Sequence, residues 1–280
     1  TGLIQAVVSL WAALAALAAL AVVPSVAGAS TGVEHLAFHA GPYTISPGAN
    51  LILADANKVP KPNQNGFMIR MAPNLRYALP NGKCCGSVPP TDVVHLHHGV
   101  WLTNGAAGEG EGNNFGGLYP FMAAGEEKTI YEFPPGYGYP IGASDTWILN
   151  YMIHNVTNIT KHVYVTYNID FVPETSPLAS RITPVHPIWM DVQDHHIYPV
   201  FNVKRGSGVN GKFTYPDMAK DPYGSGAPLN QFTIDHPGVL VATAGHLHPG
   251  GLYDDLDLTR AGATPDRQAV RAGPNTVRLF

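Results

Sequence analysis

The sequence predicts a mostly β protein: two tandem β-sandwich, jelly-roll-like subdomains preceded by one N-terminal transmembrane helix. Three observations lead to this fold class. Charged residues make up only 13% of the 280 residues, and glycine and proline are abundant, at 30 and 25. This composition is typical of many short strands and turns rather than of long surface helices. Short runs with period-2 alternation recur along the chain, whereas only the N-terminus carries a long uncharged apolar run.

The apolar run spans residues 3–23, which are 21 residues without a charge in which only Gln5 and Ser9 are polar. As a helix it would be about 32 Å long, enough to cross the hydrocarbon core of a bilayer. The small residues at 26–30 (VAGAS) also fit the cleavage site of a secretory signal peptide, but the run exceeds the usual apolar core of about 7–15 residues. We therefore expect residues 1–25 to be a retained transmembrane helix. Either interpretation sends the main domains across a membrane, into a periplasmic or extracellular space.

The strand-like runs divide the remaining chain into two parts. Runs such as VVHLHHGVWL (93–102) and TWILNYMIHNV (146–156) alternate in polarity and are separated by Gly, Pro and Asn. The segment 173–185 begins PETSPLAS, which is typical of an exposed linker. We predict a first β-sandwich at residues 26–172 and a second at residues 186–280.

The sequence does not decide the chemical state of two local motifs. The only two cysteines are adjacent, Cys84 and Cys85, so no disulfide framework can be read. The pair can be two free thiols, a strained vicinal disulfide or a soft metal site, and we expect free thiols. Two consecutive Asn-x-Thr sequons begin at Asn155 and Asn158, and they permit N-glycosylation only in a eukaryotic secretory route.

Histidine is the residue type that the composition singles out, with 13 against 16 Lys plus Arg. In VVHLHHGVWL, ideal strand geometry places His95 and His97 on one face and His98 on the other. His246 and His248, in GHLHPGG, also share a face, so their side chains could converge on one ion. Neutral imidazole suits copper, zinc, nickel or iron and does not choose among them. Two His-x-His pairs in one chain predict metal binding by at least one of them.

A longer stretch, FPPGYGYPIGASDTWILNYMIHNVTN (133–158), carries a resemblance to a known family. It resembles the part of peptidylglycine and dopamine β-monooxygenases, the copper type II ascorbate-dependent monooxygenases, where a Pro-x-Gly-x-Gly turn leads into a strand that ends in a copper-ligating histidine. The matching residue is His154. The His-His of VVHLHHGVWL matches the paired ligands of the same copper site, which implies His97 and His98. For these adjacent ligands to face one ion, the strand would need a local irregularity such as a bulge.

The downstream motif extends the resemblance. VATAGHLHPGG matches the His-x-His of the family's second copper site, which implies His246 and His248, and GHLHPGG is also similar to the plant stress-up-regulated Nod19 proteins. The motifs follow the family's order over roughly residues 40–255. The resemblance implies one copper ion in each β-sandwich. The first copper would relay electrons from an external reductant such as ascorbate, and the second would activate O₂ to hydroxylate a C–H bond.

The sequence also departs from the family pattern. A methionine downstream of the His-x-His pair completes the family's second site, but here all six methionines precede His246. The family has an arginine two residues before that pair, where this chain has Ala244, so we do not expect peptide amidation. The family's disulfides are absent as well. The fold prediction is unaffected by these departures, whereas catalysis stays open.

Other histidines form a less favoured set of candidate ligands. VQDHHIYPVF (192–201) contains His195 and His196, which could form an additional metal site or replace the missing methionine. The interpretation we favour is a polar edge at a domain junction. His95 is likewise a less favoured ligand. We expect four further histidines to be ordinary surface or packing residues: His35, His39, His162 and His236.

Two classes of function follow. The first is a membrane-anchored, extracytoplasmic copper monooxygenase with a small-molecule substrate. The alternative is a non-catalytic accessory or structural subunit of a membrane complex, and the alanine-rich segment 12–19 favours packing against other membrane proteins. A zinc hydrolase ranks last, because no glutamate lies near either His-x-His pair in the sequence. A formal charge of −4 without a Lys/Arg cluster gives no electrostatic footprint for nucleic acid, so we expect no nucleic-acid partner.

Overall fold

The computed structural model describes residues 32–57, 59–108, 110–112, 116–126, 128–190, 232–246, 256–260 and 276–279. In this part of the chain the protein is mostly β, with several sheets and only two short 3₁₀ helices, η1 (Ala106–Gly108) and η2 (Ala179–Arg181). The predicted fold class is confirmed at this level. The predicted transmembrane helix at 1–25 lies outside the described residues, and no helix among the described residues is long and apolar enough to span a bilayer.

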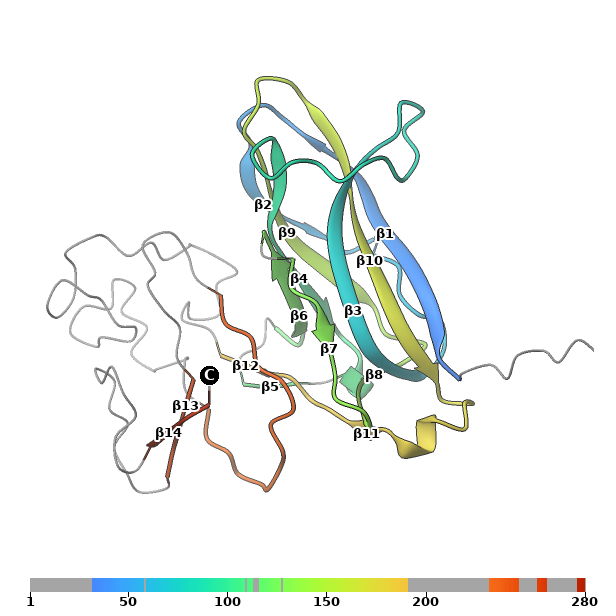
Figure 1. Cartoon of the computed structure of the whole chain (residues 1–280), viewed down its shortest axis with the longest axis vertical. Coiled ribbons are helices and arrows are strands. Elements are labelled where there is room, and N and C mark those ends of the chain that lie inside the picture. The colour runs from blue at the N-terminus through green and yellow to red at the C-terminus, as the bar shows by residue number, and fades with distance from the viewer. Residues whose placement is uncertain are drawn as a thin grey trace, which may run out of the picture. The chain divides into compact units, whose positions relative to one another are not determined.

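The larger sheet has the strand order β1-β10-β3-β8-β11 (Figure 1). Its strands are antiparallel except for the short parallel pair of β11 with β8, and β7 also pairs with β3. The bounds are β1 (Glu34–Ile45), β3 (Gly66–Tyr77), β7 (Tyr131–Glu132), β8 (Tyr137–Ile141), β10 (Lys161–Pro173) and β11 (Thr183–Pro184). The predicted linker at 173–185 therefore holds η2 and a strand that joins this sheet.

The smaller main sheet has the order β2-β9-β4-β6 and is antiparallel throughout. Its strands are β2 (Asn50–Asp55), β4 (Val94–Thr103), β6 (Tyr119–Gly125) and β9 (Trp147–Asn155). Two further pairs are short: β5 (Glu111–Gly112) with β12 (Ile188–Trp189), and β13 (Asp257–Thr259) with β14 (Thr276–Arg278). The predicted second sandwich at 186–280 lies largely outside the described residues and stays a prediction.

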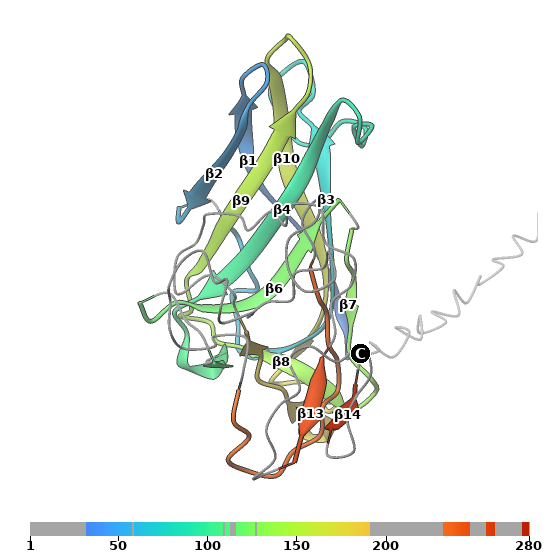
Figure 2. The ribbon, with the colours of Figure 1, turned by 90° about the vertical axis from the view of Figure 1, so that its left-hand side faces the viewer.

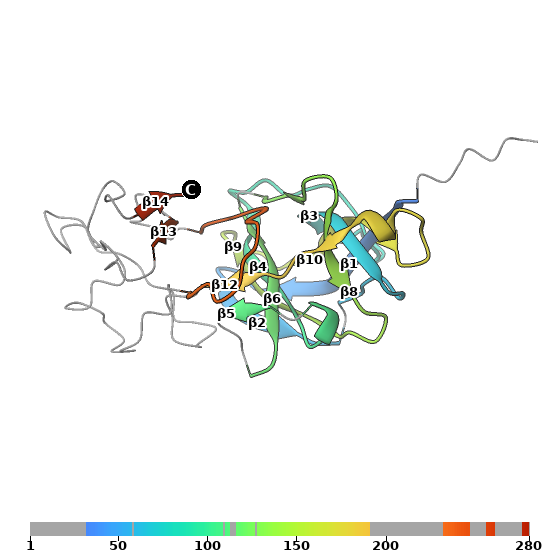
Figure 3. The same cartoon turned by 90° about the horizontal axis from the view of Figure 1, so that it is seen from below.

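The two main sheets bury their facing side chains in one hydrophobic core. Figure 2 shows β9, β4 and β6 in front of β1, β10 and β3, and Figure 3 separates the two sets of strands from below. Trp101 of β4 is fully buried, and its ring centroid lies 5.5 Å from that of Tyr167 on β10. Phe121 of β6 stacks on Tyr139 of β8 at 4.7 Å. These aromatic pairs join the sheets because burial of large rings contributes much of the free energy that keeps two β layers together.

The pairing of β4 with β9 contains a register shift. His95 lies opposite His154 and Leu96 opposite Ile153, but the next pair is His98 with Met152, which leaves His97 as an extra residue. Such an extra residue is a β-bulge, and it reverses the alternation of the residues that follow it. Leu96 and Ile153 are buried in the core. His97 and His98 therefore both lie on the face of the sheet that points away from the core.

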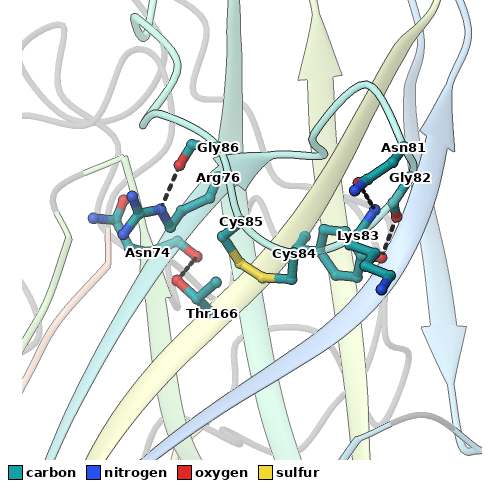
Figure 4. The surroundings of a disulfide bond; sticks show 10 residues. Asn74, Arg76, Asn81, Gly82, Lys83, Cys84, Cys85, Gly86 and Thr166 are labelled. Atoms are coloured by element: carbon teal, nitrogen blue, oxygen red, sulfur yellow. Dashed lines mark hydrogen bonds between the residues drawn. A yellow bond between two sulfur atoms is a disulfide. The ribbon is translucent and has the colours of Figure 1, made fainter.

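The loop between β3 and β4 contains the two cysteines, which the structure joins in a disulfide bond (Figure 4). The expectation of free thiols was wrong. Backbone hydrogen bonds hold the start of this loop as a hairpin, since Tyr77 N donates to Ser87 O at 2.9 Å and Gly86 N donates to Tyr77 O at 2.7 Å. The backbone thereby brings the residues that follow the cysteine pair back to the end of β3.

Candidate metal centre

Five histidines gather beside the outer face of the β2-β9-β4-β6 sheet. Strand β4 supplies three of them, and β9 and the segment 232–246 supply one each. The bulge in β4 allows the strand to contribute three histidines to one face, where strict alternation would allow two. The members are His95, His97, His98, His154 and His246, and we call them the histidine cluster.

Ring contacts connect the members of the cluster in a continuous chain. The centroids of His97 and His98 lie 5.0 Å apart with the rings at 70° to each other. His95 lies 6.2 Å from His97 and 5.1 Å from His154, edge to face with the latter. At the other end, His98 lies 5.8 Å from His246. The sequence assigned His246 to a second site with His248, but the structure places it beside a residue assigned to the first.

The two central members of the cluster, His97 and His98, are half-buried and buried, respectively. His98 is only 4% exposed. Burial lowers the pKa of His97, Glu126 opposes this shift, and the neighbouring rings of His95, His246 and His154 add to it. A lowered pKa favours the neutral imidazole, which is the form that binds a metal ion.

A carboxylate that the sequence analysis missed lies at the edge of the cluster. Nε2 of His95 lies 3.0 Å from Oε1 of Glu126, and Nδ1 of His95 lies 2.5 Å from the carbonyl oxygen of Thr91. Glu126 directly follows β6, whose Gly125 pairs with His98 of β4. No glutamate lies near the His-x-His pairs along the sequence, but Glu126 lies beside His95 in the folded chain. The only signal for Glu126 was its place just after a strand-like run, and that says nothing about which strand lies alongside.

The chemistry of the donor set fits a transition metal, because partly buried neutral imidazoles are ligands of copper and zinc. In the described part of the chain, however, no group of three or more His, Cys, Asp or Glu side chains has the placement that a bound metal ion requires. Side-chain rotation would have to accompany binding. The ligand assignments made from the sequence stay predictions, and His248, His195 and His196 lie outside the described residues.

The histidines expected to be ordinary have ordinary local partners. His35 Nδ1 lies 2.7 Å from Asp170 Oδ1 on the neighbouring strand, and His236 lies beside the carboxylate of Asp235. His162 contacts the hydroxyl of Thr44 at 3.1 Å, and the ring of His39 lies edge to face with that of Tyr164 at 5.2 Å. These contacts occur outside the histidine cluster.

Comparison with known proteins assigns this chain to no family. No protein-family model, no curated protein and no solved structure matches it. The resemblance to copper type II monooxygenases stays a prediction.

Proposed function

We propose that this protein binds copper through the histidine cluster. The observation that carries the proposal is the bulge in β4, which brings the adjacent His97 and His98 onto one face with their rings 5.0 Å apart. This is the irregularity that a His-His ligand pair needs in a strand. Burial supports the same role, since it keeps His97 in its neutral, metal-binding form.

The ligand sets proposed from the resemblance are His97, His98 and His154 for one copper ion and His246 and His248 for another. Support for the first set comes from β4 and β9, which are hydrogen-bonded neighbours and place these three histidines on the same face of the sheet. His246 lies next to His98. A second copper would therefore bind near the first sheet.

The proposed reaction is hydroxylation of a small organic substrate by O₂, as the resemblance implies. One oxygen atom enters a C–H bond, and the other leaves as water. Two electrons from an external reductant of the ascorbate class and two protons balance the reaction. The protein would supply the imidazole ligands and the surface on which the substrate is held.

The proposal also includes the detailed fold of the protein and its location in the cell. We propose two β-sandwiches, at 26–172 and 186–280, held outside the cytoplasm by a transmembrane helix at 1–25. The shared core of the two main sheets supports the first sandwich. The uncharged run at 3–23 supports the helix.

A second function, a non-catalytic copper-binding or structural subunit, is favoured by one specific observation. All six methionines precede His246, so the thioether ligand that the family places downstream is missing. The alanine-rich segment 12–19 favours close packing with helices of other membrane proteins.

Elemental analysis of the purified full chain after copper reconstitution tests the proposal. We expect about two copper ions per chain and about one in the His246→Ala variant. His35→Ala is the matched control, because it removes an exposed histidine that pairs with Asp170. Ascorbate-dependent O₂ consumption would then separate the monooxygenase from the subunit. A wild-type chain that binds no copper would contradict both copper-binding functions.

A further inference from the structure

The two ring nitrogens of His95 have the partners that are typical of a metal-binding histidine. Its Nδ1 lies 2.5 Å from the Thr91 carbonyl oxygen, which can only accept a hydrogen bond, so this nitrogen carries a proton. A metal-binding histidine commonly donates a hydrogen bond from one ring nitrogen to a backbone carbonyl. This bond fixes the tautomer and leaves the other nitrogen for the ion. In His95 the other nitrogen, Nε2, points to the carboxylate of Glu126.

The separation of these two groups matches two ligands on one ion. Nε2 of His95 and Oε1 of Glu126 lie 3.0 Å apart. Two ligand atoms, each about 2.0–2.1 Å from a zinc ion and about 90–110° apart, are separated by about 2.9–3.4 Å. A divalent cation can therefore replace the direct contact between the two side chains without a large movement of either.

His154 is the nearest third ligand. It lies opposite His95 in the β4–β9 register, and the two ring centroids are 5.1 Å apart. Two imidazoles bound through Nε2 to one tetrahedral zinc ion have centroids about 5 Å apart. The His154 ring has to turn toward the His95–Glu126 pair to complete the set.

We propose that His95, Glu126 and His154 form a mixed imidazole–carboxylate site for a divalent cation of the Zn²⁺ class. This inference goes beyond the proposed copper function and reassigns one residue, His154. The imidazole-only group that remains is His97, His98 and His246, whose rings are connected at 5.0 and 5.8 Å. Two adjacent metal sites on one sheet face follow, and they differ in ligand chemistry.

The choice of cation follows from the donors. Two imidazoles and a carboxylate are a usual ligand set for zinc, whereas a carboxylate is less suited to the soft cuprous ion. The Glu126 side chain is 50% exposed, and the His95 side chain is 11% exposed. The pair is therefore open to solvent on the glutamate side. Both residues line a surface pocket with Thr91 and Lys128, and this pocket gives an ion a route to the pair.

Titration of the metal-free full chain with Zn²⁺ alone tests the site, with Co²⁺ as a spectroscopic probe of the ligands. We expect Glu126→Gln and His154→Ala each to weaken zinc binding at least about 10-fold and to alter the visible Co²⁺ bands. Glu132→Gln is the matched control, because Glu132 is an exposed carboxylate paired with Arg70 at 3.6 Å, and it should bind zinc like the wild type. Circular dichroism of each variant establishes that it is folded, and Glu126→Asp, which keeps the carboxylate, should retain the Co²⁺ spectrum more closely than Glu126→Gln.

A copper titration of the same variants separates this inference from the copper proposal. We expect His154→Ala to keep copper. We expect His98→Ala to keep zinc and to weaken the binding of the copper ion that His97 and His98 share. Wild-type zinc binding that Glu126→Gln does not weaken, or no zinc binding at all, would overturn the mixed site. Loss of both metals in His154→Ala would return His154 to the copper site and would overturn the reassignment. If the chain binds zinc but no copper, the copper proposal fails and the mixed site stands.

Discussion

The rings of His97 and His98 lie 5.0 Å apart on one face of a sheet, although the two residues are neighbours in one strand. In a regular strand, consecutive side chains point to opposite faces. The pair shares a face because His97 is the extra residue of a bulge in the β4–β9 register. The backbone of β4 thus places two adjacent imidazoles on one side of the sheet, where a single ion can reach both.

Substitution of these two histidines should show strong coupling in copper affinity. We expect His97→Ala and His98→Ala each to weaken copper binding about 10-fold or more. In the double variant, the loss of binding free energy should be much smaller than the sum of the two single losses, because both side chains bind one ion. Competition titration with a copper chelator measures the affinities. The double variant of His97→Ala with His35→Ala is the control, and its change in copper-binding free energy should equal the sum of the two single changes. Additive effects in the His97/His98 pair would show that the two rings do not share an ion.

Asn155 should be far more important for stability than its neighbour in the second sequon. Its buried side-chain amide donates to the carbonyl oxygens of Ile45, Ser46 and Ile159, at 3.1, 3.1 and 2.9 Å. Asn155→Ala removes all three hydrogen bonds made by this buried amide, and we expect it to lower the free energy of unfolding by about 2–4 kcal/mol. Asn158→Ala changes an exposed turn residue and should stay within about 0.5 kcal/mol of the wild type. Urea denaturation measures both, and equal effects would contradict the structural role of Asn155.

The same difference in burial predicts which sequon can carry a glycan. Asn155 is fully buried and its amide is engaged in hydrogen bonds, whereas Asn158 is exposed in the turn between β9 and β10. Expressed through a eukaryotic secretory route, the chain should carry a glycan at Asn158 and none at Asn155. Peptide mapping after enzymatic deglycosylation identifies the modified residue. Asn158→Gln should abolish the mass shift, and a glycan that persists in this variant would count against the prediction.

Gly66 should tolerate no side chain. A Cβ atom at this position would lie 2.3 Å from Val172 O and 2.5 Å from a ring carbon of Phe171. Both neighbours belong to β10, which pairs with the start of β3, so the clash cannot be relieved without moving paired backbone. We expect Gly66→Ala to lower the free energy of unfolding by about 1–3 kcal/mol or more. Gly238→Ala is the matched control, because a Cβ there meets nothing within 4 Å. Unchanged urea midpoints in both variants would show that the packing at Gly66 is looser than described.

Tyr43 should contribute to a loss of stability at alkaline pH. Burial, and then its hydrogen bond to Asp55 at 2.8 Å, raise the pKa of Tyr43 far above that of an exposed tyrosine. The unfolded chain loses this proton above about pH 10 while the folded chain keeps it. The free energy of unfolding is therefore unaffected by this group below about pH 10 and falls above it by about 1.4 kcal/mol per pH unit.

The variant Tyr43→Phe isolates this contribution. Burial raises the pKa of Tyr167 and Tyr151 as well, so the alkaline loss should remain in the variant but with a smaller slope, by about one proton. Urea denaturation at a series of pH values from about 8 to 11 measures the slope. Equal slopes in wild type and variant would show that Tyr43 titrates alike in the folded and unfolded chains.

The sequence alone was sufficient for the mostly β fold and for the positions of the central strands. The alternating runs at 93–102 and 146–156 correspond to β4 (Val94–Thr103) and β9 (Trp147–Asn155). Period-2 alternation is a local property, because it depends only on which side chains of one strand face the core. The sequence also singled out the histidines of these strands.

Tertiary structure alone decided how the histidines are grouped. The bulge at His97, the approach of Glu126 to His95 and the contact of His246 with His98 all join residues far apart in the sequence or depend on strand register. Register is set by how whole strands pack against one another, and a shift of one residue moves every following side chain to the other face. A short motif cannot encode that choice, because the free energy that selects it comes from the core shared by both sheets.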